Sequence, residues 1–245
     1  MEKTVKGLIL KSRNLCEYDR IATILTEQGI IEAVIRGKNR ITNNPLASVS
    51  VFGYYEFSVF FGKKTNYINS AAAINGFYDL RLDVVKVSLA SYFSELTIEL
   101  SPQGKQSADI LRLFLNTLYL LETDKREMPL LKAVFELRLI SSAGFMPNLV
   151  SCAECHCYEN ETFLLIPEKG GIYCTGCAKS GDCLAIEINI HILTAMRHIV
   201  YSEPDKLFNF KCSGAETLSR ITEKYAIYHI QKDFNSLEMY RRLGV

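Results

Sequence analysis

The first seventy residues alternate between apolar and polar positions with a period of two. Five runs are rich in β-branched and aromatic residues, which favour strands. They cover residues 4–11, 20–26, 29–37, 51–61 and 66–73. Gly29, Gly53 and Gly62 interrupt the pattern, and residues 41–48 have the composition of a loop. The pattern predicts five short strands, a number that suits a small closed barrel of the oligonucleotide-binding (OB) or the SH3-like kind.

From about residue 80 the apolar positions recur at helical spacing. The periodic stretches are residues 84–100, 108–122, 130–144, 186–203 and 216–232. Gly144 followed by Pro147 predicts the end of the third helix. Ser213 and Glu216 have the spacing of a capping box that opens the last helix. We expect the helices on both sides of residues 150–182 to pack into one bundle from which that segment protrudes.

The change of period predicts an α+β chain of several domains. The predicted division is a five-stranded OB barrel at 1–78, a helical domain in two parts at 79–149 and 184–245, and an inserted finger at 150–183. With 245 residues, 48% hydrophobic and 22% charged, the chain is typical of soluble globular proteins. It has no signal-peptide apolar region and no apolar run as long as a membrane span, which predicts a cytoplasmic protein with no membrane partner.

Four cysteines carry the strongest local pattern. Cys152-x2-Cys155 and Cys174-x2-Cys177 are separated by 18 residues, a spacing typical of one tetrahedral Zn²⁺ site. The intervening stretch is long enough for a hairpin, with Gly170 and Gly171 at its turn. Four thiolates leave no open position for water, so the predicted metal is structural. Two chance thiol pairs or two disulfides are the alternatives, and the second-ranked ligands are His156, Cys157 and Cys183.

The net charge of +1 hides an asymmetry along the chain. Residues 1–70 contain ten Lys/Arg and six Asp/Glu, whereas residues 71–245 contain eighteen and twenty-one. A basic first module predicts contact with a polyanion. The candidate DNA-binding residues lie at predicted strand ends and loops, where such barrels bind single strands. They are Lys11, Arg13, Arg36, Lys38, Arg40, Lys63 and Lys64.

Aromatic residues between 54 and 61 interleave with these cations. Strand alternation predicts that most of them are barrel core and that one or two face outward to stack on bases. A merely solvated loop is the alternative for residues 36–40.

The sequence lacks the common catalytic motifs. It has no G-x-x-x-x-G-K-[ST], no G-x-S-x-G and no H-E-x-x-H, and its four His form no ligand pattern. This favours a binding protein over an enzyme. A zinc-ribbon RNA-binding accessory protein stays open as an alternative, as does a zinc-dependent enzyme with an open coordination position.

Three segments resemble the bacterial RecO family. Residues 8–40 contain a K-S-R segment, a D-R-I step, a glycine turn and a basic G-x-x-R exit. Residues 135–155 resemble the family's helix-Gly-x-x-Pro entry into a Cys finger, and 170–177 its close. Residues 48–54 depart from the pattern, because many relatives carry a Gln-Pro-Phe step there.

The resemblance implies an OB barrel, a helical domain and a zinc finger in a recombination mediator. Such proteins bind single- and double-stranded DNA and anneal strands coated with single-stranded DNA-binding protein (SSB). With RecR they help to load RecA at gaps, in the bacterial cytoplasm at the nucleoid. The acidic, apolar SSB tail needs an apolar groove flanked by a cation. Arg138, surrounded by apolar residues, is the candidate cation; a pair with a carboxylate such as Glu136 is the alternative.

Overall fold

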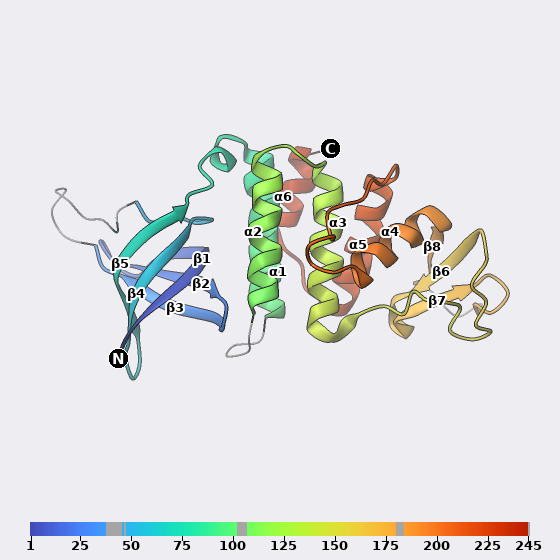
Figure 1. Ribbon diagram of the computed structural model, residues 1–245, viewed down its shortest axis with the longest axis horizontal. Helices are drawn as coiled ribbons and strands as arrows, with labels where there is room; N and C mark the ends of the chain where they lie inside the picture. The colour runs from blue at the N-terminus through green and yellow to red at the C-terminus, as the bar shows by residue number, and fades with distance from the viewer. Residues whose placement is uncertain (38–45, 47, 102–106, 180–183, 245) are drawn as a thin grey trace. The chain divides into compact units, whose positions relative to one another are not determined.

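The chain folds as an α+β protein, seen in a computed structural model that describes residues 1–37, 46, 48–101, 107–179 and 184–244 (Figure 1). It divides into two compact units. Unit 1 comprises Met1–Thr123 and Asn235–Val245, and unit 2 comprises Asp124–Phe234. The division into domains at residues 78, 149 and 183 stays a prediction.

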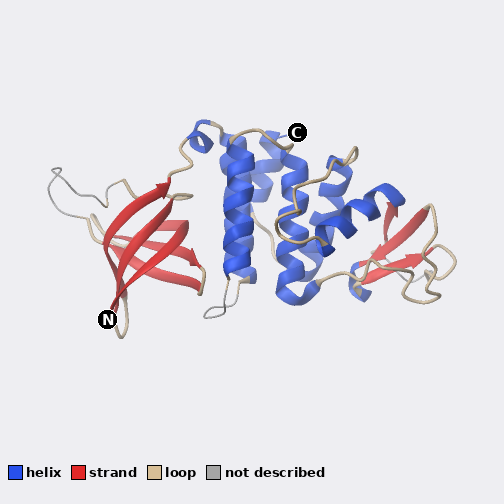
Figure 2. Ribbon diagram, in the orientation of Figure 1, coloured by secondary structure: helices blue, strands red, loops and turns tan. Residues whose placement is uncertain are grey.

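Unit 1 begins with the five predicted strands (Figure 2). They are β1 (Glu2–Asn14), β2 (Arg20–Thr26), β3 (Gly29–Ile35), β4 (Tyr54–Phe61) and β5 (Asn66–Asn75). They close into a barrel in the order β1-β2-β3-β5-β4. Every neighbouring pair is antiparallel except β3 and β5, which run parallel. The prediction of a small closed barrel is therefore confirmed.

The long first strand closes the barrel by pairing on both edges. Its first half pairs with β4 and its second half with β2, and Gly7 pairs with both neighbours. A Cβ on Gly7 would lie 2.4 Å from Cγ2 of Ile24, closer than atoms pack. The close approach of three strands at this point therefore requires glycine.

Inward side chains fill the barrel. The core cluster includes Ile9, Ile24, Phe57 and Val59. Tyr55 is also buried there, and its hydroxyl donates to the carbonyl of Ser48 at 3.2 Å and accepts from the Ser50 amide at 3.1 Å. Full burial of each large apolar side chain contributes about 1.5–3 kcal/mol.

Three helices complete unit 1: α1 (Val84–Leu100), α2 (Ala108–Glu122) and α6 (Asn235–Gly244), with a short 3-10 turn η1 (Asp79–Leu82) before them. Asp83 caps α1 by accepting from the amides of Val85 at 2.8 Å and Lys86 at 3.2 Å. Helices α1 and α2 contact β1 and β2, and α6 packs on α1. The bounds predicted for α1 and α2 are confirmed.

Unit 2 combines three helices with a small sheet. The helices are α3 (Met128–Ile140), α4 (Ile190–Tyr201) and α5 (Ala215–Ile230), and α3 packs against both others. The strands β6 (Thr162–Ile166), β7 (Gly171–Cys174) and β8 (Ile186–Asn189) form a sheet in the order β7-β6-β8. A single turn, η2 (Ser141–Phe145), extends α3, and Gly144 has φ 101°, which confirms the predicted stop.

Two local predictions in unit 2 are wrong. Residues 186–189 form strand β8 instead of helix, because their period is two and β6 offers them an edge. Asn189 then caps α4 by accepting from the Ile192 amide at 2.9 Å. The capping box at Ser213 does not form, since α5 starts after Gly214 with no side-chain cap. Glu216 instead pairs with Arg220 at 3.6 Å.

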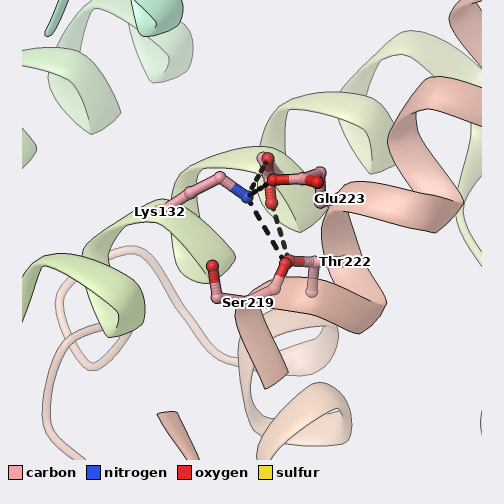
Figure 3. A network of polar contacts seen from close by, with 5 residues as sticks. Lys132, Ser219, Thr222 and Glu223 are labelled. Atoms are coloured by element: carbon pink, nitrogen blue, oxygen red, sulfur yellow. Dashed lines mark hydrogen bonds and ion pairs between the residues drawn. The ribbon is translucent and has the colours of Figure 1, made fainter. Parts of the chain in front are cut away.

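A buried ionic network joins α3 to α5 (Figure 3). The ammonium of Lys132 lies 2.8 Å from a carboxylate oxygen of Glu136 and 2.7 Å from one of Glu223. The hydroxyl of Thr222 donates to the other oxygen of Glu136 at 2.7 Å. The side chains of Lys132 and Glu136 are 1% and 0% exposed, so this is a paired charge inside the core. Nothing in the sequence pattern had predicted it.

Candidate nucleic-acid interface and metal centre

A bulge in β1 turns two of the predicted DNA-binding cations outward. Ile9 belongs to the barrel core. The register of β1 against β2 shifts between Ile9 and Lys11, with Leu10 as the extra residue. Because side chains alternate along a strand, Lys11 and Arg13 point away from the core instead of following Ile9 into it. Both are exposed.

The end of β3 brings a third cation onto the outer face of β5. The end of β3 runs parallel to the start of β5, with Val34 opposite Tyr67. Arg36 follows β3 directly, and its guanidinium carbon lies 4.2 Å from the centre of the Tyr67 ring. Lys63 and Lys64 occupy the turn into β5 and are exposed. Because β3 runs parallel to β5, Arg36 follows the Ile35–Ile68 pair, whereas Lys63 and Lys64 precede Asn66, on the other side of Tyr67 along β5.

Arg13 lies on the same outer surface, further round the barrel. It pairs with Ile21, which pairs with Val34, which pairs with Tyr67. Three strand spacings separate Arg13 from Tyr67, about 14 Å along the sheet. We call this outer surface, with Lys11, Arg13, Arg36, Lys63 and Lys64, the basic barrel face.

Two predicted DNA-binding residues, Lys38 and Arg40, lie outside the described residues. The backbone that leads to them is held in place. The Gly37 amide donates to Asp19 Oδ1 at 3.0 Å. A Cβ on Gly37 would lie 2.0 Å from the carbonyl oxygen of Tyr18, so only glycine fits. The exit of β3 is therefore fixed against the β1–β2 loop.

The structure separates the aromatic residues into core and surface. Tyr55 and Phe57 are buried in the barrel, whereas Phe60 is 43% exposed. Tyr67 was missed in the sequence, although Ile68 faces inward and alternation alone places Tyr67 outward. The prediction that one or two aromatics of residues 54–61 face outward is met by Phe60.

The cations of the basic barrel face are not neutralised by neighbours. Among the described residues, none of Lys11, Arg13, Arg36, Lys63 and Lys64 forms an ion pair. Acidic side chains also lie on the barrel surface, and Asp19 accepts from the amide of Gly37, the residue after Arg36. Glu32 is exposed on β3. Glu2 accepts from Ser58 and from Asn69, and these hydrogen bonds lower its pKa.

The four predicted metal ligands come together in unit 2. Their Sγ atoms all lie within 4.8 Å of one another, and those of Cys155 and Cys174 are 3.7 Å apart. Four sulfurs at 2.3 Å around a tetrahedral ion stand about 3.8 Å apart, so the donor set fits such an ion. The β6–β7 hairpin joins the two knuckles, as predicted, with Gly170 in a left-handed conformation at its turn.

Backbone amides favour a thiolate at the buried ligand. Burial of Cys152 opposes ionisation, but hydrogen bonds from backbone groups of Cys155, Cys174 and Glu154 lower its pKa to about 6. The Cys174 amide lies 3.3 Å from Cys152 Sγ. In contrast, side-chain hydrogen bonds with Cys174 and Cys155 raise the pKa of Cys177 to about 12. Without a cation the cluster shares protons, and a metal ion would replace them.

The second-ranked ligands lie outside this cluster. The Cys157 thiol donates to the carbonyl of Glu159 at 3.1 Å. His156 is exposed with φ 60°, and no described group of metal-binding residues includes it. Cys183 lies outside the described residues. The prediction that Cys152, Cys155, Cys174 and Cys177 form the set is the one that the geometry favours.

Arg138 belongs to α3, and its side chain reaches the C-terminal end of α4. Its Nη1 donates to the carbonyls of Ile199 at 3.2 Å and Val200 at 2.7 Å. A cation there also interacts favourably with the helix dipole. Glu136 pairs with Lys132, so the expected alternative of an Arg138–Glu136 pair is not what the structure contains. The role of Arg138 towards an SSB tail stays a prediction.

Both parts of the chain match models of one family. Residues 1–77 match the model described as Recombination protein O N terminal, and residues 81–238 match Recombination protein O C terminal. This chain belongs to the RecO family. The N-terminal RecO match covers the barrel, and the C-terminal RecO match runs from η1 into α6.

Curated RecO relatives match over nearly the whole chain. A DNA repair protein RecO of Acetivibrio thermocellus is 30% identical over 97% of this chain and 95% of its own length. Those of Alkaliphilus metalliredigens and Symbiobacterium thermophilum are 27% and 29% identical, over 97% and 96% of this chain and 98% and 94% of theirs. The chain is therefore a RecO-family DNA repair and recombination protein. Among the helices that the structure describes, none is long and apolar enough to cross a membrane.

Proposed function

We propose that this chain is a non-enzymatic recombination mediator whose barrel is of the OB kind. It binds single- and double-stranded DNA and anneals complementary strands, including strands coated with SSB. With RecR it helps to load RecA at gaps, in the bacterial cytoplasm at the nucleoid. Family membership supports the setting, and the basic barrel face supports the chemistry.

The observation that carries the proposal is the set of unpaired cations on the basic barrel face. Lysine and arginine side chains that neutralise phosphates displace counterions, which gives affinity without sequence readout and a strong dependence on salt. A surface that holds two strands at once raises their local concentration, and base pairing then completes annealing. No covalent bond changes in this process, so no catalytic group is needed.

The Cys cluster supports one structural Zn²⁺ per chain. Four thiolates suit this ion and close its coordination sphere, so the metal would hold the finger together and supply no reactive water. Arg138 is proposed as a cation for the SSB tail through the donors that the α4 carbonyls leave unused. Tail-peptide binding at full strength by Arg138→Ala would remove that assignment.

The test is strand annealing of two labelled complementary oligonucleotides, each coated with cognate SSB. We expect rapid duplex formation without nucleotide, and a rate that falls as salt rises. DNA binding without annealing would leave a binding module only. If neither occurs, the mediator function is wrong, and competition with RNA oligonucleotides tests the RNA-binding alternative.

A variant with Arg36, Lys38 and Arg40 all changed to Ala tests the phosphate contacts. Its affinity for single-stranded DNA should fall, and the plot of log K against log salt should become shallower by about 2, since each lost contact removes about 0.7 from the slope. Fluorescence anisotropy titrations at several salt concentrations measure both quantities. An unchanged slope would place this segment outside the DNA site.

A further inference from the structure

A continuous row of side chains crosses the outside of the barrel beside the cations. Ile21 on β2 pairs with Val34 on β3, Val34 with Tyr67 on β5, and Tyr67 with Phe60 on β4. All four side chains therefore share the outer face, at strand spacings of about 4.8 Å. The row becomes aromatic at Tyr67 and Phe60. These residues belong to β5 and β4, which lie side by side in Figure 1.

Phe60 is the accessible end of this row. It is 43% exposed, although it is a large apolar residue that is paired within the sheet, near the end of β4. Its Cε1 lies 3.7 Å from where a Cβ of Gly62 would stand, so the ring reaches towards the β4–β5 turn that carries Lys63 and Lys64. Residues directly opposite in a sheet have Cβ atoms about 4.5–5.5 Å apart, which places Tyr67 beside Phe60 on the outer face.

Arg36 adds a planar cation to the aromatic pair. Its guanidinium lies over the Tyr67 ring at 4.2 Å and covers one face of that ring. A guanidinium plane held in this way offers its outer side for stacking on a nucleic-acid base. Its remaining N–H groups lie in the same plane, where they can reach a phosphate.

A groove of mixed polar and apolar lining adjoins the row at Val34. It has a volume of about 390 Å³, and its lining includes Ile21, Ile30 and Val34 beside Thr65 and Asn66. Lys64 and Glu32 are the charged residues among its lining. Val34 in the groove pairs with Tyr67, so the groove lies next to the aromatic end of the row.

The charges around this surface select the kind of ligand. The cations Arg36, Lys63, Lys64 and Arg13 border the row, against the acids Glu32, Glu2 and Asp19. An apolar and aromatic strip inside a net cationic border complements a chain with flat apolar faces and a phosphate backbone. Acidic peptides have the negative charge that complements the cationic border, but they lack a regular series of flat rings that could stack on the aromatic residues.

We propose that Phe60, Tyr67 and Arg36 form a platform on which unpaired bases of a single strand stack. This inference rests on the proposed function and deepens it, because it names unpaired bases as the ligand of the basic barrel face. Bases inside a duplex are stacked on each other and cannot reach such a platform. The surface therefore prefers single strands to duplex, and holds their bases in an order open to pairing.

The first experiment compares Phe60→Leu and Tyr67→Leu with a matched control, Tyr78→Leu. Leucine keeps apolar bulk and removes the flat ring. Tyr78 is a fitting control because Arg81 lies over its ring at 5.3 Å, a similar pair away from this face. Each variant is titrated with a single strand, the same strand made of abasic sites, and a duplex, after thermal unfolding confirms its fold.

We expect each platform variant to lose about fivefold or more in affinity for the single strand, because stacking of one base is worth at least that factor. Affinity for the abasic strand and for the duplex should not change, and the salt slope should stay that of the wild type. Tyr78→Leu should bind all three like the wild type. Equal losses on all three ligands, or no loss on the single strand, would overturn the proposal.

A second experiment uses the absence of tryptophan from the chain. Phe60→Trp provides a single emitter on the platform and Tyr78→Trp one on the control pair. Stacking of a base should quench the first on adding the single strand but not the abasic strand, and should leave the second unchanged. Equal responses of the two emitters would contradict stacking at Phe60.

The experiments distinguish a failure of the proposed DNA-binding function from a failure of the stacking platform. If wild-type protein binds single strands in a salt-dependent manner while the platform variants bind equally well, the proposed function survives and the platform is wrong. If the wild type binds no DNA at all, the proposed function fails and the platform fails with it.

Discussion

Leu10 decides where Lys11 and Arg13 point. A regular strand would place Lys11 on the same side as Ile9, inside the barrel, where an unpaired ammonium is very costly. One extra residue resolves this conflict by moving Lys11 and Arg13 to the outer face. Sequence alternation alone cannot locate such a bulge, because it depends on the two strands against which β1 pairs.

Replacing Lys63 and Lys64 together by Ala should weaken DNA binding through electrostatics alone. Both side chains are exposed in the β4–β5 turn, so the fold should persist. If both contact phosphates, the salt slope for a single strand should become shallower by about 1.4. Anisotropy titrations between low and physiological salt measure it.

A matched control for that change is Lys206→Ala in unit 2. Lys206 is also an exposed lysine, pairs with Glu203 at 2.9 Å and belongs to unit 2, whereas the barrel belongs to unit 1. The Lys206→Ala variant should leave the affinity for single-stranded DNA and the salt slope unchanged. A slope that changes equally in both variants would mean that general charge matters and the barrel face does not.

Helices α3 and α5 are held in register by the buried network around Lys132. Its ammonium also donates to the carbonyl of Ser219 at 3.4 Å, so the cation has partners on both helices. A buried pair adds little over apolar packing when complete, but removing one partner leaves the other charge buried. The network therefore constrains which turns of α3 and α5 can face each other.

Lys132→Met should destabilise unit 2 by about 3–5 kcal/mol, because it leaves Glu136 inside the core without its cation. Urea unfolding followed by circular dichroism measures the loss. The double change Lys132→Met with Glu136→Leu should recover much of it, since Glu223 is 18% exposed and can turn to water. A single variant as stable as the wild type would show that the network contributes nothing.

Elements with a strong local period were predictable, and those decided by distant partners were not. The stretches 84–100 and 108–122 match α1 and α2. An amphipathic or wholly apolar helix can be predicted because its pattern depends only on residues within the helix itself. Residues 186–189 lie directly before α4 and share its apolar character, but β6 recruits them as β8. The Lys132 network joins residues almost ninety positions apart, and no spacing rule connects them.

The same distinction holds for the candidate sites. The cluster of four Cys was predictable because each pair is local and its geometry follows from C-x2-C. The cations of the barrel were predictable as residues but not as a face. Tyr67 was overlooked because its partner Phe60 and its cation Arg36 come from other strands and loops.

Charge is divided along the chain in a way that separates the two candidate sites. Residues 1–70 carry a balance of +4, whereas the finger region 150–183 contains five Asp/Glu and only two Lys/Arg. A polyanion is attracted to the first and repelled by the second. The metal centre also lies in unit 2, and the barrel in unit 1. Metal and DNA are therefore expected to act on different parts of the protein.

Removing the metal with a strong chelator should destabilise the finger but leave DNA affinity intact. Ligand binding to the folded state stabilises it, so loss of the ion lowers the unfolding temperature of unit 2. Acid should act in the same direction, because protons displace the ion from four thiolates. Thermal unfolding and anisotropy on the same metal-depleted sample compare the two effects in the full chain.

Re-adding Zn²⁺ controls for the chelator, and Cys155→Ser repeats the loss of the site by mutation. Both the chelated protein and the variant should unfold at lower temperature, and both should bind a single strand within about twofold of the wild type, well under the tenfold that 1.4 kcal/mol represents. An affinity that falls with the metal and returns with it would bring the finger into the DNA interface. That result would require the acidic finger to hold the strand through contacts other than charge.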